Sequence, residues 1–125
     1  MRQLRYFIER IRSVMFALAG IWTMLKTQQN AWTHCCATVV VVGMGFFLDV
    51  GLEDWRWLVL AISLVWVAEA LNTAFEFLAD VVSPEFHPQV KHAKDVAAGA
   101  VLIAAMGAVI IGLLVLGPPL LELIL

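Results

Sequence analysis

Apolar residues recur through residues 1–27 at alternating spacings of four and three positions. They are Leu4, Ile8, Ile11, Met15, Leu18, Trp22 and Leu25. On an α-helix this spacing makes one continuous apolar stripe. Charged residues, among them Arg5, Glu9 and Lys26, lie off the stripe. A helix of this kind lies along a membrane surface, so we expect a surface helix over about residues 1–27.

Three apolar stretches follow that are long enough to cross a membrane. They cover about residues 32–49, 55–78 and 96–116. Polar segments separate them, Asp49 to Asp54 as a short turn and "ADVVSPEFHPQVKHAKD" as a longer connection. Gly117, Pro118 and Pro119 are expected to end the third stretch, because proline interrupts a helix. The pattern predicts an all-α, multi-pass membrane protein with a single domain over residues 1–125.

The composition agrees with this pattern. The chain is 62% hydrophobic and 14% charged, with a mean hydropathy of +0.91, which is far from the composition of a soluble domain. Three spans in one protomer enclose little of a binding site, so we expect the chain to form an oligomer. No nucleic-acid partner is expected.

The basic residues predict how the chain is oriented in the membrane. Those that fall on one side of the three spans are Arg2, Arg5, Arg10, Arg12, Lys26, Lys91 and Lys94. Arg56 alone falls on the other side. Because basic residues mark the cytoplasmic side of a membrane protein, we expect the amino terminus and the connection around residues 80–95 to be cytoplasmic.

The second span carries polar residues in an otherwise apolar helix. Glu69, Asn72, Glu76 and Asp80 follow one another at spacings that bring them near one face of a helix. A charged side chain near the centre of a bilayer costs on the order of 3 kcal/mol, so such residues are commonly functional. They could instead pair with Lys94 or with an arginine of a neighbouring helix and only stabilise the assembly.

The different depths of Glu69 and Glu76 in the membrane predict different roles for them. Counted from Trp55, Glu69 lies about 21 Å along the helix and Glu76 about 10 Å further, nearer the cytoplasmic surface. Glu69 is the better candidate for a general base, because a carboxylate removed from water is a stronger proton acceptor. Glu76 and Asn72 offer oxygen ligands that suit magnesium.

Lys94 and Asp95 come directly before the third span. We expect them to lie at the amino terminus of a helix, where free backbone amides and a lysine form a phosphate site. A carboxylate base, metal ligands and a phosphate site are the parts that phosphoryl transfer requires, although no glycine-rich phosphate loop is present. Two simpler interpretations stay open: Lys94 as a marker of the cytoplasmic side, and Asp95 as a helix cap. His34, His87 and His92 lack the spacing of metal ligands, and interfacial hydrogen bonds are the simpler interpretation.

Two motifs carry a resemblance to a known family. "EALNTAFEFLAD", followed by "HPQVKHAKDVAAGAVLIAA", resembles the bacterial membrane diacylglycerol kinase and undecaprenol kinase family. "FALAGIW" and "TQQNAWTH" extend the resemblance over nearly the whole chain. It implies a homotrimer in the bacterial inner membrane, with a surface helix and three transmembrane helices in each protomer. It also implies an active site between protomers at the cytoplasmic surface, where Mg-ATP phosphorylates a membrane lipid.

The resemblance implies a role for each matching residue. Glu69 would be the catalytic base, and Glu76 would bind the magnesium ion that accompanies ATP. Asn72 and Asp80 would support the centre. The nucleotide would be bound by Gln28, Glu76, Glu85, Phe86, His87, Lys94 and Asp95, and the lipid by Asn30, Trp32 and Ala98.

Gln28 departs from the family pattern, which usually has a glutamate at this position that shares the metal with Glu76. Glutamine offers a carbonyl oxygen but no negative charge. This change keeps open a catalytically altered family member. A noncatalytic assembly or transport subunit is the alternative from another class. The stretches "NTA" and "KDVAAGAVL" resemble the undecaprenol branch slightly more, while diacylglycerol stays open as the acceptor.

Overall fold

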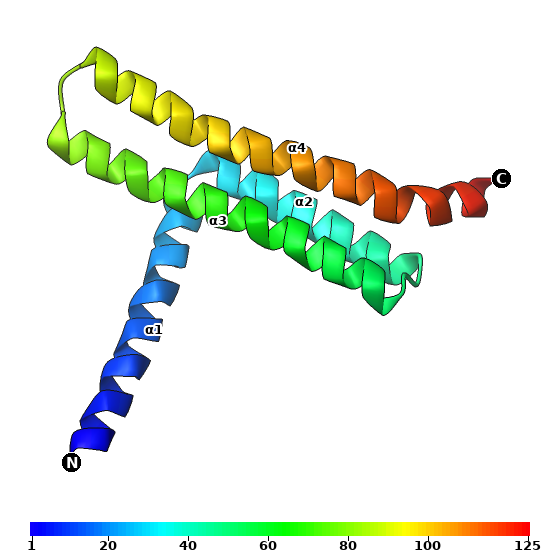
Figure 1. Cartoon of the computed structure of the whole chain (residues 1–125), viewed down its shortest axis with the longest axis horizontal. Coiled ribbons are helices and arrows are strands. Elements are labelled where there is room, and N and C mark those ends of the chain that lie inside the picture. Colours follow the sequence, from blue (N-terminus) through cyan, green and yellow to red (C-terminus); the bar gives the residue numbers. More distant parts are fainter.

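The computed structural model describes all 125 residues and contains four α-helices. They are α1 (Arg2–Thr27), α2 (Gln29–Phe47), α3 (Leu52–Val82) and α4 (Pro88–Ile124). The helices α3 and α4 form a long antiparallel hairpin with the shorter α2 beside it, and α1 projects from this bundle at a steep angle (Figure 1). The predicted all-α architecture is therefore confirmed.

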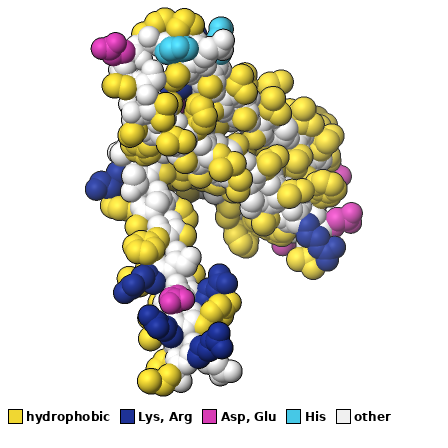
Figure 2. Space-filling model, turned by 60° about the vertical axis from the view of Figure 1, so that its left-hand side comes forward, with side chains coloured by type: hydrophobic (Ala, Val, Ile, Leu, Met, Phe, Trp, Pro, Cys, Tyr) yellow, Lys and Arg dark blue, Asp and Glu magenta, His cyan; other side chains and the backbone are white.

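The first helix has the bounds that its apolar stripe predicts. Only Gln28, in an extended conformation, separates α1 from α2. Its backbone N–H still donates to the carbonyl of Met24, at 2.9 Å. Met24 is the one buried residue of α1 and Leu25 is half-buried, so the rest of the helix is exposed in a single chain. Figure 2 shows lysine and arginine side chains gathered along this projecting helix.

The other three helices are each long and apolar enough to cross a membrane. Apolar side chains cover the visible face of the bundle, and charged groups and histidines gather at its ends (Figure 2). The second and third predicted spans lie inside α3 and α4, which are longer than predicted. The first predicted span overlaps α2, but α2 ends at Phe47 and not at residue 49. The chain is therefore a multi-pass membrane protein.

The start of α4 differs from the prediction. The helix begins at Pro88, and only residues 83–87 form the loop between α3 and α4. Pro88 starts the helix because its fixed φ is already helical and its missing N–H would have had no partner there. His87 caps this end, since its Nδ1 accepts a hydrogen bond from the N–H of Gln89 at 3.2 Å. The expectation that Lys94 and Asp95 lie at a helix amino terminus was wrong, and so was the possible capping role of Asp95.

The end of α4 differs as well. The helix continues through Pro118 and Pro119 to Ile124, so the prediction that these prolines end it was wrong. A proline removes its own backbone donor, and the apolar residues from Leu120 onward continue the helical pattern beyond that local loss.

The end of the bundle away from the α3–α4 loop is held by apolar packing. Leu58, Val115 and Leu116 form a buried cluster between α3 and α4. On α2, Gly45 is buried directly against the ring of Trp55. Only 14 of the 125 residues are buried in the single chain, so most of the apolar surface is available to lipid or to other copies.

Candidate active site

The buried polar residues of the bundle lie together on α3. They are Glu69, Asn72 and Thr73. Glu69 is completely buried, at 0% exposure, beside the first turns of α2. A cavity of about 270 Å³ lies between α2, α3 and α4 at this level. Its lining includes Asn30, Thr33, His34, Glu69, Asn72 and Ala98. We call this cavity the polar pocket.

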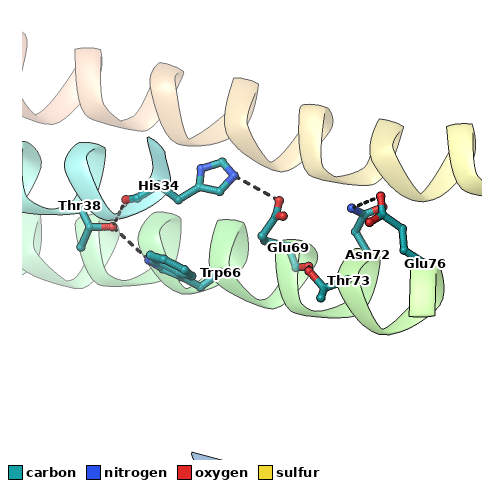
Figure 3. Close-up of polar contacts among 7 residues, drawn as sticks. All are labelled: His34, Thr38, Trp66, Glu69, Asn72, Thr73 and Glu76. Carbon is teal, nitrogen blue, oxygen red and sulfur yellow. Dashed lines mark hydrogen bonds and ion pairs between the residues drawn. The ribbon is translucent and has the colours of Figure 1, made fainter. Parts of the chain in front are cut away.

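Glu69 faces a histidine of the neighbouring helix. Nε2 of His34 lies 3.3 Å from Oε2 of Glu69 (Figure 3). The carboxylate oxygens have no aligned hydrogen-bond donor within the chain. The hydroxyl of Thr73 donates to the backbone carbonyl of Glu69 at 2.9 Å and leaves its side chain free. Glu69 is therefore a buried acid with capacity to accept a proton.

Asn72 and Glu76 continue the polar face one and two turns further along α3. Nδ2 of Asn72 lies 3.5 Å from Oε1 of Glu76, at the long limit of a hydrogen bond (Figure 3). The amide oxygen of Asn72 is buried without a partner, whereas Glu76 is partly exposed. Side-chain oxygen atoms are therefore spaced along α3 from the polar pocket toward the α3–α4 loop.

Two ion pairs lie near the α3–α4 loop. Lys94 contacts Asp80 across the hairpin, with Nζ 2.5 Å from Oδ1. Lys91 contacts Asp95 along α4, at 2.6 Å. Both pairs lie at the surface. Of the four polar residues predicted to share one face of α3, Asp80 therefore stands apart: it pairs with Lys94 of α4 and not with the groups around Glu69.

The three loop residues predicted to bind nucleotide are exposed. Glu85, Phe86 and His87 lie in or next to the turn between α3 and α4. The carbonyl of Glu85 accepts a hydrogen bond from the hydroxyl of Ser83 at 2.8 Å. A cavity of about 470 Å³ lies between the two helices beneath this turn, and His87 lines it.

The remaining predicted residues lie in different surroundings. Asn30 and Ala98 line the polar pocket, but Trp32 is exposed on α2. Gln28 is half-buried at the break between α1 and α2, and its side chain makes no hydrogen bond to Glu76. No three His, Cys, Asp or Glu side chains lie close enough to hold a metal ion by themselves.

His34 is a site residue that the sequence interpretation missed. The sequence predicts an interfacial hydrogen bond for it, whereas in the structure it contacts the buried acid of the pocket. An available signal was that it is an ionisable residue at the start of a membrane span, which is a common mark of function.

An apolar groove adjoins the polar pocket. It has a volume of about 380 Å³ and runs between α2, α3 and α4 as far as Leu120. His34 and Ala105 line both the groove and the polar pocket. A buried acid is thus placed where a hydrocarbon-lined space meets a polar one.

Comparison with known proteins shows which family the chain belongs to. Residues 15–116 match the family model described as prokaryotic diacylglycerol kinase. The chain belongs to this family. Membership confirms the resemblance and identifies the chain as a membrane lipid kinase.

Relatives of this diacylglycerol kinase family member match most of its length. An undecaprenol kinase of Bacillus subtilis is 38% identical over 109 residues, which cover 87% of this chain and 89% of the relative. A diacylglycerol kinase of Synechocystis is 41% identical over 112 residues, which cover 89% of this chain but 64% of the relative. A diacylglycerol kinase of Pseudomonas aeruginosa is 30% identical over 89 residues, covering 71% of this chain and 72% of the relative.

Proposed function

We propose that this lipid kinase transfers the γ-phosphate of Mg-ATP to the hydroxyl of a membrane lipid, with undecaprenol or diacylglycerol as the acceptor. The observation that carries the proposal is the complete burial of Glu69 in a pocket that adjoins an apolar groove. A lipid hydroxyl that reaches the pocket would meet a proton acceptor in a place poor in water.

The proposed reaction is a direct displacement. Glu69 accepts the proton of the lipid hydroxyl as the hydroxyl oxygen forms a bond to the γ-phosphorus. The bond between that phosphorus and the oxygen bridging to the β-phosphate breaks, and ADP leaves with its electron pair. No covalent enzyme intermediate is required, because Glu69 acts on the proton alone.

The surroundings of the pocket support a lipid as the acceptor. The groove that meets the pocket at His34 and Ala105 is lined mostly by aliphatic side chains. A hydrocarbon chain in this groove would place its hydroxyl end at Glu69. Asn30 and Ala98 line the pocket and would contact that end, while Trp32 would contact lipid from its exposed position on α2.

Magnesium fits the site as an ion that arrives with the nucleotide. The chain has no closed cluster of acidic ligands, but Glu76 is accessible and the buried amide oxygen of Asn72 lacks a partner. Magnesium is commonly bound through one or two protein carboxylates together with substrate phosphates. When bound it would neutralise charge that develops on the phosphates. Gln28 would be a weaker ligand of this ion than Glu76, because its amide oxygen carries no negative charge.

The nucleotide is proposed to bind at the loop end of the α3–α4 hairpin. Glu85, Phe86 and His87 are exposed there, and His87 borders a cavity beneath the turn. Lys94 and Asp95 lie two turns into α4, so free helix amides are not available beside them. Lys94 would contact the phosphates through its ammonium group, whereas Asp95, which pairs with Lys91, would accept a hydrogen bond from another part of the nucleotide. Asp80 would act indirectly, by holding Lys94 when no phosphate is present.

We further propose that the kinase is a homotrimer in the bacterial inner membrane, with its amino terminus in the cytoplasm. A groove of about 670 Å³ beside α3 and α4 supports self-association. Its lining includes the small residues Ala68, Ala97, Ala100, Ala104 and Gly107. Small residues allow close approach of a helix from a second copy. The basic residues of α1 support the proposed orientation.

Transfer of labelled phosphate tests the proposal. Purified protein in mixed micelles would be given Mg-ATP with diacylglycerol or with undecaprenol, and label in the lipid fraction would be measured. The undecaprenol kinase of Bacillus subtilis matches this chain over 89% of its own length, so we expect undecaprenol to be the better acceptor. Absence of label from both lipids, in a folded oligomer with excess magnesium, would favour a catalytically altered or noncatalytic protein.

A further inference from the structure

Glu69 has a second polar neighbour whose chemistry bears on its role as a base. His34 projects from α2, and its Nε2 lies 3.3 Å from Oε2 of Glu69. The imidazole is only 15% exposed and the carboxylate 1% exposed. Neither Nε2 nor Oε2 has another partner in the chain. A buried polar atom without a partner is costly, so the two atoms satisfy one another best by forming a hydrogen bond.

We propose that His34 is a positioning residue for Glu69. Its Nε2–H donates to Oε2 and holds the carboxylate in one orientation, while Oε1 stays free for the proton of the lipid hydroxyl. This inference deepens the proposed lipid-kinase function and rests on it.

The contact between His34 and Glu69 is close but not fully aligned. The distance from Nε2 to Oε2 is within ion-pair range, but the ring N–H is not aligned as a full hydrogen bond. Contacts of catalytic groups are often long or poorly aligned without substrate and tighten when it binds. We expect rotation of either side chain to complete this bond.

The imidazole is itself held in place from α3. Its ring packs edge-on against Trp66, with ring centres 6.0 Å apart and planes at 70°. The indole N–H of Trp66 donates to the hydroxyl of Thr38 at 3.0 Å. That hydroxyl lies 2.7 Å from the backbone carbonyl of His34, to which it donates. Figure 3 shows this chain of contacts leading from Trp66 to Glu69. Both the ring and the backbone of His34 are therefore fixed relative to Glu69.

No other charged group of the pocket can take this role. Besides Glu69, His34 is the only titratable side chain among the lining residues. The α4 side of the pocket consists of Ala98, Val101, Leu102 and Ala105, and the amide of Asn72 is directed to Glu76. His34 is thus the one titratable side chain beside Glu69 that can fix the orientation of its carboxylate.

Two substitutions separate hydrogen bonding from packing. His34→Gln keeps an N–H donor of similar reach, and His34→Leu removes the donor but keeps an apolar side chain. We expect His34→Leu to lower kcat roughly 10- to 100-fold, the usual loss when the partner that orients a functional group is removed. The KM for ATP should stay within about twofold of wild type, and His34→Gln should recover most of the lost kcat.

His92→Leu is the matched control, because His92 is exposed on α4 and contacts no acid of the pocket. It should leave kcat unchanged. Size-exclusion elution and thermal unfolding of every variant would be compared with those of wild type. Full activity in His34→Leu would overturn the inference. Equal loss in His34→Gln and His34→Leu, with wild-type folding, would overturn it too.

A measurement that needs no activity separates this inference from the kinase proposal. The ¹⁵N resonance of His34 Nε2 would be recorded in detergent micelles for wild type, Glu69→Gln and Glu76→Gln. We expect Glu69→Gln to shift the resonance and Glu76→Gln to leave it in place. No shift in Glu69→Gln would overturn the inference. A shift in a protein without lipid-kinase activity would support the bond and contradict the proposed function.

Discussion

The ammonium of Lys94 on α4 lies 2.5 Å from the carboxylate of Asp80 on α3, and this ion pair joins the two helices near the loop that connects them. Asp80 is 65% exposed and Lys94 36% exposed. An exposed ion pair contributes only about 0–1 kcal/mol to stability. Lys94 can therefore exchange Asp80 for a phosphate group at little cost.

Lys94→Gln is expected to raise the KM for ATP on the order of tenfold, because a charged contact to phosphate is lost. Its stability should change by less than about 1 kcal/mol. ATP titrations at saturating lipid would measure the effect. Lys26→Gln, on the exposed face of α1, is the control. An unchanged KM in Lys94→Gln would remove Lys94 from the nucleotide site.

Glu76→Gln is expected to raise the magnesium concentration needed for half-maximal activity at least about tenfold. Glutamine keeps an oxygen ligand but loses the negative charge that attracts the cation. Magnesium titrations at constant ATP would show this. Glu53→Gln, in the exposed first turn of α3 at the other end of the bundle, provides the comparison. Identical magnesium curves for wild type and Glu76→Gln would contradict the metal assignment.

Gln28→Glu tests whether the glutamine weakens the kinase. A carboxylate near the nucleotide should increase metal-dependent turnover several-fold and lower the magnesium requirement. Turnover would be measured across a magnesium series beside Gln29→Glu, which changes the neighbouring residue to the same acid. No gain in Gln28→Glu would mean that position 28 does not limit metal binding.

Gly45→Ala and Gly43→Ala form a matched pair on α2. A Cβ at Gly45 would lie 2.6 Å from the ring of Trp55, whereas a Cβ at Gly43 meets nothing within 4 Å. The first change should destabilise the protein by about 1–3 kcal/mol through overpacking. The second should be neutral or stabilising by up to about 1 kcal/mol, because alanine favours a helix over glycine. Thermal unfolding in micelles would compare them; equal melting temperatures would contradict the observed packing.

The helices could largely be predicted from the sequence, because long apolar stretches admit few other structures in a membrane. The bounds of α1 follow directly from its stripe of apolar residues. The ends of α4 could not be predicted in the same way, since Pro88 begins a helix and Pro118 lies within one. A proline can do either, and the difference depends on whether the neighbouring backbone groups find partners.

The candidate site was only partly predictable. The spacing of Glu69, Asn72 and Glu76 along one helix correctly indicated that they follow a shared face. The contact between His34 and Glu69 joins two helices, and helical periodicity gives no information on which side chains meet across helices. The pairing of Lys94 with Asp80 also depends on contacts between helices. It requires α4 to begin at Pro88, inside the segment that the sequence predicts as a polar connection.

Phosphoryl transfer by Glu69→Gln, measured beside wild type and Glu53→Gln, tests the central claim most directly. The three proteins would be compared at saturating Mg-ATP with the better lipid acceptor, after confirming equal size-exclusion elution. A general base contributes roughly 10²- to 10⁴-fold, so we predict at least about a 100-fold loss in Glu69→Gln and no loss in Glu53→Gln. Turnover of Glu69→Gln within a few-fold of wild type would contradict the assignment of the buried acid as the catalytic base.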